Sequence, residues 1–147
     1  MNTALSPQAL VLVVDDDSMT RFLVTEALEP EGFRIEEAAS GLEALAAFQR
    51  RVPDLILLDV MMPGMSGHDT CRQLKAAPLT AAIPVIFVTA LNDMRDELSG
   101  FEAGAVDYIT KPLSPAIVRA RVRTHLSLVR IDELKETRLQ IVQRLGL

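Results

Sequence analysis

The stretch PDLILLDVMMPGMSG, residues 53–67, decides how this 147-residue chain folds. Its apolar run, residues 55–58, is short and shows no polar alternation, which is typical of a parallel strand buried on both faces. Asp59 follows, and the Pro63-Gly64 pair then requires a loop. Open α/β sheets bind ligands beyond the carboxyl ends of their strands, so Asp59 is a candidate nucleophile or metal ligand. A solvated acid that merely ends a strand is the alternative for this segment alone.

The rest of the chain alternates between strand and helix patterns. Four further strands are expected at residues 10–14, 33–37, 83–88 and 105–110. Helices are expected at residues 19–28, 41–51, 67–77 and 92–103, the first capped by Ser18 and the last closed by Gly104. This alternation predicts an α/β fold, a doubly wound five-stranded parallel sheet with helices on both faces and right-handed crossovers.

Polar side chains follow four of the five expected strands. Asp15, Asp16 and Asp17 follow the first strand, and Asp59 follows the third. The hydroxyl of Thr89 follows the fourth strand and the amine of Lys111 follows the fifth. The carboxyl ends of parallel strands share one edge of a sheet, so these groups are expected to converge. Clustered acids raise one another's pKa values or require a cation, and their hard oxygen atoms suit Mg²⁺. The assortment predicts a phosphoryl-transfer site in which Asp59 attacks phosphorus.

Composition limits the other kinds of site. One cysteine, Cys71, excludes an internal disulfide, and the two histidines, His68 and His125, are too scattered to suggest a histidine metal site. No apolar run approaches the roughly 18 residues needed to cross a bilayer, and the first ten residues lack the pattern of a signal peptide. A cytoplasmic protein without membrane contact is therefore expected.

Four motifs occur in order along the chain: VLVVDDDSMTR, LILLDVMMPGMSG, VIFVTA and DYITKP. Together they resemble the receiver (CheY-like) domain of two-component response regulators over about residues 10–125. The resemblance implies a flavodoxin-like fold with strand order 2-1-3-4-5. It also implies a phosphoacceptor switch rather than an enzyme. Asp59 would receive a phosphoryl group from a sensor histidine kinase, a phosphotransfer protein or a small phosphodonor.

The resemblance implies a set of magnesium ligands. Asp16 and Asp59 would bind Mg²⁺ through their side chains, and Met61 would bind it through its backbone carbonyl. Asp15 would hold a water molecule that coordinates the same ion.

The resemblance also implies how the switch works. Thr89 would hydrogen-bond the phosphoryl group and Lys111 would form an ion pair with it. Tyr108 would turn inward into the space that Thr89 leaves. The Lys111–Pro112 peptide bond is expected to be cis, as in that family.

The tail extends beyond the expected domain. We expect a lead-in at residues 1–9, the receiver at 10–127 and a helical extension at 128–147. Residues at alternating steps of three and four between positions 117 and 145 form a seam that is apolar except at Thr124, Ser127 and Arg138. This seam favours a parallel homodimeric coiled coil, with a lone signalling helix as the alternative. From Ser114 onward the sequence has seven Lys and Arg residues and three Asp and Glu residues. With no aromatic residues among them, they favour a solvated helix face over direct nucleic-acid binding.

The tail also resembles linkers that precede an output domain. Its QRLG run is similar to the one that opens HD-GYP cyclic-di-GMP phosphodiesterase domains, and similar linkers precede diguanylate cyclase domains. An HD-GYP output outside this chain is favoured, and a stand-alone receiver that signals by direct binding is the alternative. A small aspartyl-phosphate phosphatase is disfavoured because Met61 stands where such enzymes place a second acid. A flavin-binding module is disfavoured because the acids after the first strand would repel a phosphate.

Overall fold

The computed structural model describes residues 8–90 and 103–128. Five strands form one sheet: β1 (Leu10–Val14), β2 (Arg34–Ala38), β3 (Leu55–Asp59), β4 (Val85–Ala90) and β5 (Asp107–Lys111). Their order is β2-β1-β3-β4-β5, and every neighbouring pair is parallel. This order confirms the predicted flavodoxin-like topology.

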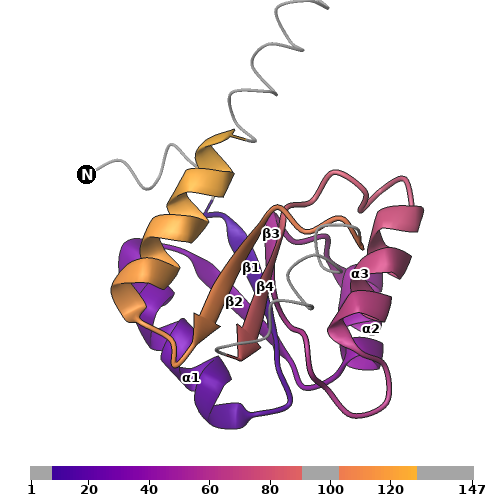
Figure 1. Cartoon of the computed structure of the whole chain (residues 1–147). Coiled ribbons are helices and arrows are strands. Elements are labelled where there is room, and N and C mark those ends of the chain that lie inside the picture. The colour runs from indigo at the N-terminus through magenta and orange to yellow at the C-terminus, as the bar shows by residue number, and fades with distance from the viewer. Residues whose placement is uncertain (1–7, 91–102, 129–147) are drawn as a thin grey trace, which may run out of the picture.

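Helices cover both faces of the sheet. They are α1 (Ser18–Leu28), continued by the short 3₁₀ helix η2 (Glu29–Glu31), then α2 (Gly41–Arg50), α3 (Gly67–Ala76) and a C-terminal helix described over residues 115–128. In Figure 1 α1 and the C-terminal helix, coloured orange to yellow, lie on one face, and α2 and α3 lie on the other. The arrangement is the doubly wound one that the sequence predicts.

The core consists of two apolar clusters, one on each face of the sheet. Val11 and Val13 of β1 pack with residues of α1 and the C-terminal helix. Leu12 and Val14 pack with residues of α2 and α3. Successive side chains of a strand point to opposite faces, so a strand covered on both sides must be apolar at every position. This explains why β1 and β3 show no alternation.

Element boundaries differ from the expected ones by one or two residues. Strand β4 begins at Val85 rather than Ile83, because Pro84 has no N–H to donate to a sheet ladder.

The prediction that Ser18 caps α1 was wrong. Asp17 is the N-cap, its carboxylate accepts the N–H of Met19 at 3.0 Å, and Ser18 is the first helical residue. Aspartate and serine are equally good caps, so adjacent candidates cannot be separated by propensity.

Part of the expected structure lies outside the described residues, namely the helix at 92–103 up to residue 102 and the extension beyond residue 128. Gly104 has a φ of 111° directly after the helical Ala103, which is the left-handed conformation expected of a glycine that closes a helix. The Lys111–Pro112 bond is cis, as expected. Within the described ranges, no helix combines the length and apolar character needed to span a bilayer.

Asp107, at the start of β5, holds the C-terminal helix against the sheet. Its carboxylate accepts a hydrogen bond from Arg121 at 3.1 Å and lies 2.9 Å from Nε2 of His125. The backbone N–H of Tyr108 also donates to it, at 2.7 Å. Burial raises the pKa of Asp107, but the bonds from His125 and Tyr108 and the charge of Arg121 outweigh burial, so its pKa is lowered.

Asp107→Asn is expected to lower the free energy of unfolding at pH 7 by about 1–2 kcal/mol, because it weakens charge-assisted hydrogen bonds. A depressed folded pKa gives stability that is present above the unfolded pKa, near 3.8, and is lost as pH falls through the folded value. Urea unfolding should therefore show the wild type and the variant converging at low pH. Glu36→Gln, which removes an exposed pair with Arg50, is the control and should cost under about 0.5 kcal/mol. Equal losses in the two variants would contradict this role of Asp107.

Candidate functional site

Three acids meet at the carboxyl edge of the sheet. One oxygen atom from each of Asp15, Asp16 and Asp59 lies within 4.8 Å of the others. Asp15 follows β1 and Asp59 ends β3, and these strands are neighbours in the sheet. Asp15 and Asp59 are buried, whereas Asp16 is exposed. Asp17, the fourth acid predicted here, instead caps α1.

Lys111 lies between two of the carboxylates. Its Nζ is 3.3 Å from Oδ2 of Asp15 and 3.6 Å from Oδ1 of Asp59. Burial lowers the pKa of Lys111, but the negative charges of Asp59 and Asp15 outweigh burial, so the pKa is raised. The residue therefore places a stable positive charge beside Asp59.

The Asp59 carboxyl carries the largest perturbation at this edge. Burial, followed by the negative charge of Asp15, raises its pKa from 3.8 to about 7, although Lys111 acts in the opposite direction. The N–H of Met61, which donates to Oδ1 of Asp59 at 3.3 Å, also lowers it. One lysine thus leaves the acids only partly compensated, and a bound cation would favour the ionised form.

Thr89 carries a buried hydroxyl group next to this site. Its side chain is buried, 3% exposed, and Oγ1 has no hydrogen-bond partner within the described part of the chain. Thr89 lies opposite Thr110 in the sheet, and Thr110 directly precedes Lys111. Buried hydroxyl groups are nearly always hydrogen-bonded, so Thr89 is suited to donate to an oxygen that arrives from outside.

Tyr108 lies on β5, and β4 separates it from the strand that ends in Asp59. It is opposite Phe87 on β4, and the two ring centroids are 5.8 Å apart. Its side chain is partly buried against the cluster that contains Phe87. The structure places the predicted switch residue beside β4, and its movement stays a prediction.

Two residues that support this edge had no assigned role in the sequence. Gly67, the first residue of α3, lies so close to the backbone of Asp59 that an added Cβ would be 2.2 Å from its carbonyl oxygen. Arg21 donates to the carbonyl oxygen of Asp15 at 2.6 Å. The sequence pattern identifies Gly67 only as the first residue of an expected helix. Nothing in the local pattern around Arg21 identifies a backbone carbonyl as its partner.

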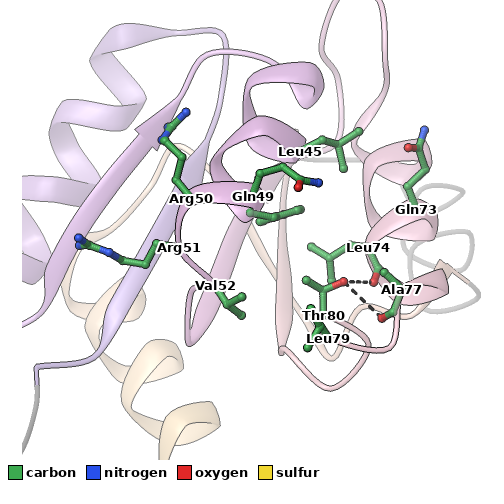
Figure 2. Close-up of a pocket in the computed structure, with 11 residues that line it drawn as sticks. Leu45, Gln49, Arg50, Arg51, Val52, Gln73, Leu74, Ala77, Leu79 and Thr80 are labelled. Carbon is green, nitrogen blue, oxygen red and sulfur yellow. Dashed lines mark hydrogen bonds between the residues drawn. The ribbon is translucent and has the colours of Figure 1, made fainter.

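A groove lies away from the acids, between the C-terminal ends of α2 and α3. It encloses about 490 Å³ and is lined by residues that include Phe48, Val52, Leu74 and Leu79 (Figure 2). Because the crossover helices run antiparallel to the strands, their C-terminal ends lie at the opposite edge of the sheet. The groove is therefore separate from the acidic site.

A doubly wound parallel sheet with three acids, a lysine and a threonine at its carboxyl edge defines the class of α/β domain that the four motifs resemble. Residues 11–123 match the family model described as the response regulator receiver domain. The chain therefore belongs to the response regulator receiver family, a family of phosphoacceptor switches.

Known relatives agree with this assignment. Response regulator PleD of Caulobacter vibrioides is 46% identical over 130 residues, which cover 87% of this chain and 28% of PleD. DNA-binding response regulator MtrA of Mycolicibacterium paratuberculosis is 44% identical over 116 residues, which cover 79% of this chain and 50% of MtrA. The chain thus spans at most half of these two relatives.

A solved structure with the same fold is the signal receiver domain of a signal transduction histidine kinase from Syntrophus aciditrophicus. It superimposes with a TM-score of 0.77 at 38% identity and covers 82% of this chain and 92% of that domain. This agreement over 82% of the chain confirms the fold class.

Proposed function

We propose that this chain is a phosphorylation-dependent switch in which Asp59 accepts a phosphoryl group from the phosphohistidine of a sensor histidine kinase or phosphotransfer protein. The observation that carries the proposal is the position of Asp59. Asp59 ends a strand beside Asp15, Asp16 and Lys111. It is also close in the sheet to the buried Thr89 hydroxyl, which has no hydrogen-bond partner among the residues that the structure describes. Phosphoryl transfer depends mainly on positioning and on charge stabilisation, and these residues supply both.

The transfer is an in-line displacement. One carboxylate oxygen of Asp59 attacks phosphorus and forms the new O–P bond. The P–N bond of the phosphohistidine breaks, and its electron pair returns to the imidazole nitrogen. Lys111, 3.6 Å from Asp59, pairs with the transferred phosphoryl oxygens, and the Thr89 hydroxyl donates to one of them.

The donor set fits Mg²⁺, which prefers oxygen ligands and takes one or two carboxylates alongside water and phosphate oxygens. Asp16 and Asp59 would bind it directly, Asp15 through water and Met61 through its backbone carbonyl. When bound, the ion supplies positive charge that offsets the charge of the phosphoryl oxygens. The proximity of the three carboxylates and the raised pKa of Asp59 support this assignment.

The partner kinase is expected to dock beside the acids on α1. Helix α1 directly follows the acidic loop, and three large apolar side chains near its N-terminal end are exposed. They are Met19 at 60%, Phe22 at 56% and Leu23 at 41%. Adjacent exposed apolar groups of this size are suited to a protein interface. A cytoplasmic location is part of this proposal, since the donor would be a cytoplasmic kinase.

Phosphorylation would act through β5 on the C-terminal helix. The phosphoryl group adds roughly −1.5 to −2 charge, which draws the Thr89 hydroxyl toward it and leaves space for Tyr108. Asp107, the neighbour of Tyr108, contacts Arg121 and His125 of the C-terminal helix. A displacement of β5 therefore reaches that helix directly.

The proposed output is a domain outside this chain. Relatives named PleD and DNA-binding MtrA match similarly well, so receiver similarity does not choose among outputs. The linker resemblance favours an HD-GYP cyclic-di-GMP phosphodiesterase over a diguanylate cyclase. A stand-alone receiver is the alternative, and a homodimer through the C-terminal helix stays part of the proposal.

Incubation with Mg²⁺ and acetyl phosphate tests the phosphoacceptor. The wild type should gain one phosphoryl group by intact mass, and hydroxylamine should remove it as expected for an acyl phosphate. Asp59→Asn should gain none. Asp17→Asn removes a neighbouring acid but keeps a good cap for α1, so it should be phosphorylated like the wild type. Equal phosphorylation of Asp59→Asn and the wild type would refute the assignment.

A further inference from the structure

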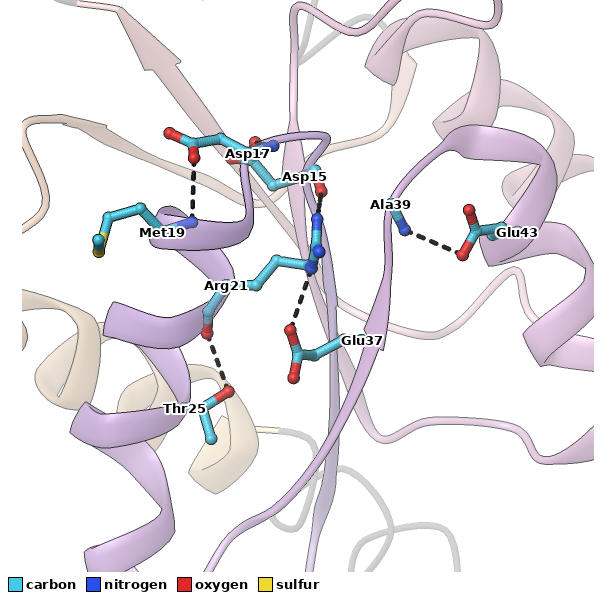
Figure 3. Close-up of polar contacts among 8 residues, drawn as sticks. All are labelled: Asp15, Asp17, Met19, Arg21, Thr25, Glu37, Ala39 and Glu43. Atoms are coloured by element: carbon cyan, nitrogen blue, oxygen red, sulfur yellow. Dashed lines mark hydrogen bonds and ion pairs between the residues drawn. The ribbon is translucent and has the colours of Figure 1, made fainter.

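Arg21 connects α1 to the ends of two strands. Its Nη1 donates to the backbone carbonyl of Asp15 at 2.6 Å, and its Nε donates to Oε1 of Glu37 at 3.0 Å (Figure 3). The side chain is only 17% exposed. The guanidinium therefore spans the end of β2 and the loop that carries the acids.

The contact with Asp15 fixes one peptide group of that loop. The Asp15 carbonyl and the Asp16 nitrogen belong to the same peptide group. By binding this carbonyl, Arg21 fixes the orientation of the peptide group that precedes the Cα of Asp16. On the other side, the Asp15 N–H donates to the Ala38 carbonyl at 3.1 Å. The Asp15 carboxylate is held as well, because Oδ1 accepts the Asp17 N–H at 2.9 Å. Asp16 itself is exposed, so its direction depends on this backbone.

We propose that Arg21 is a positioning residue for the cation site, acting through the Asp15–Asp16 peptide group to direct the Asp16 carboxylate toward Asp59. This inference rests on the proposed function, because it assumes that the three acids hold a divalent cation. Residues that orient metal ligands typically change metal affinity about 10–100-fold when they are replaced.

The two contacts of Arg21 differ in the effect expected of each. The ion pair with Glu37 is half exposed on the acid's side, 48%, and such pairs contribute little. The bond to the Asp15 carbonyl is short, charge-assisted and part-buried. If Arg21 merely attached α1 to the sheet, losing the Asp15 contact and losing the Glu37 contact would have similar effects on cation affinity. A positioning role predicts that only the Asp15 contact matters for the cation.

The test measures Mn²⁺ affinity from the electron paramagnetic resonance signal of the free ion, with Mg²⁺ as competitor. Arg21→Met keeps chain length and helix propensity but removes both contacts, and it should weaken binding about 10-fold. Glu37→Gln is the matched control that leaves the Asp15 contact in place, and it should bind within about two-fold of the wild type. Arg21→Lys, which lacks the planar fork, should lie between Arg21→Met and the wild type.

The inference is overturned if Arg21→Met binds Mn²⁺ like the wild type, or if Glu37→Gln weakens binding as much as Arg21→Met does. If Arg21→Met fails to fold, Arg21→Lys decides, and wild-type affinity in that variant overturns the inference. Failure of the proposed function is distinguishable, because the wild type itself would then neither bind Mn²⁺ nor take up a phosphoryl group.

Discussion

Asp59→Asn is expected to stabilise the metal-free protein above pH 7, although it removes the proposed phosphoacceptor. The pKa of Asp59 is raised from 3.8 to about 7, so the folded state binds this proton more tightly than the unfolded state. Stability from a raised carboxyl pKa is fully present below the unfolded value and is lost as pH rises toward the folded value. Asparagine removes the titration and keeps the shape of the side chain.

The expected gain follows from the size of the shift. Each pKa unit corresponds to about 1.4 kcal/mol, so roughly three units set an upper limit of about 4 kcal/mol. Lys111 loses one of its two carboxylate partners in the variant, which offsets part of this. We therefore expect the free energy of unfolding to rise by about 2 kcal/mol at pH 8, with little difference near pH 4.

Urea unfolding in EDTA, followed by far-ultraviolet circular dichroism at several pH values, checks this expectation. Asp17→Asn is the control, because it removes an exposed acid from the same loop and retains a capping side chain. Its unfolding free energy should differ little from the wild type at every pH. If Asp59→Asn is no more stable than the wild type at pH 8, burial and the charge of Asp15 do not destabilise the ionised form of Asp59.

Gly67→Ala is expected to be strongly destabilising and to disturb the phosphoacceptor. A Cβ at this position would be 2.2 Å from the carbonyl oxygen of Asp59, 2.8 Å from the Cα of Val60 and 2.9 Å from the carbonyl carbon of Asp59. All three atoms belong to the backbone, so no side chain can rotate away. The N–H of Gly67 also donates to the Val60 carbonyl at 3.0 Å, which holds α3 against this loop. Overpacking of this kind costs about 3 kcal/mol.

Gly64→Ala is the matched control for the effect of an added methyl group, because Gly64 lies in the loop just before α3. Gly64 has a φ of 77° but no atom within 4 Å of an added Cβ, so only left-handed backbone strain of about 1 kcal/mol is expected. Urea unfolding of both variants separates steric contact from backbone strain. Equal losses at the two positions would mean that α3 moves away from Asp59 without cost.

Local patterns in the sequence were sufficient to predict the architecture. The wholly apolar runs of β1 and β3 require cover on both faces, and parallel strands must end at a common edge. Alternating strand and helix patterns then place Asp59, Thr89 and Lys111 at that edge. The sequence did not fix the start of α1, because the adjacent residues Asp17 and Ser18 are both suitable N-caps.

The tertiary structure was needed to show which of these polar groups lie close together. The strand pattern alone places three consecutive acids at this edge, and the resemblance to receivers selects Asp15 and Asp16 among them. The structure brings these two close to Asp59 and shows that Asp17 caps α1. The pKa of Asp59 depends on burial and on Asp15, which is remote in sequence. The close fit of Gly67 depends equally on distance in space. Such properties arise from electrostatic and steric contacts between segments that meet only when the sheet forms.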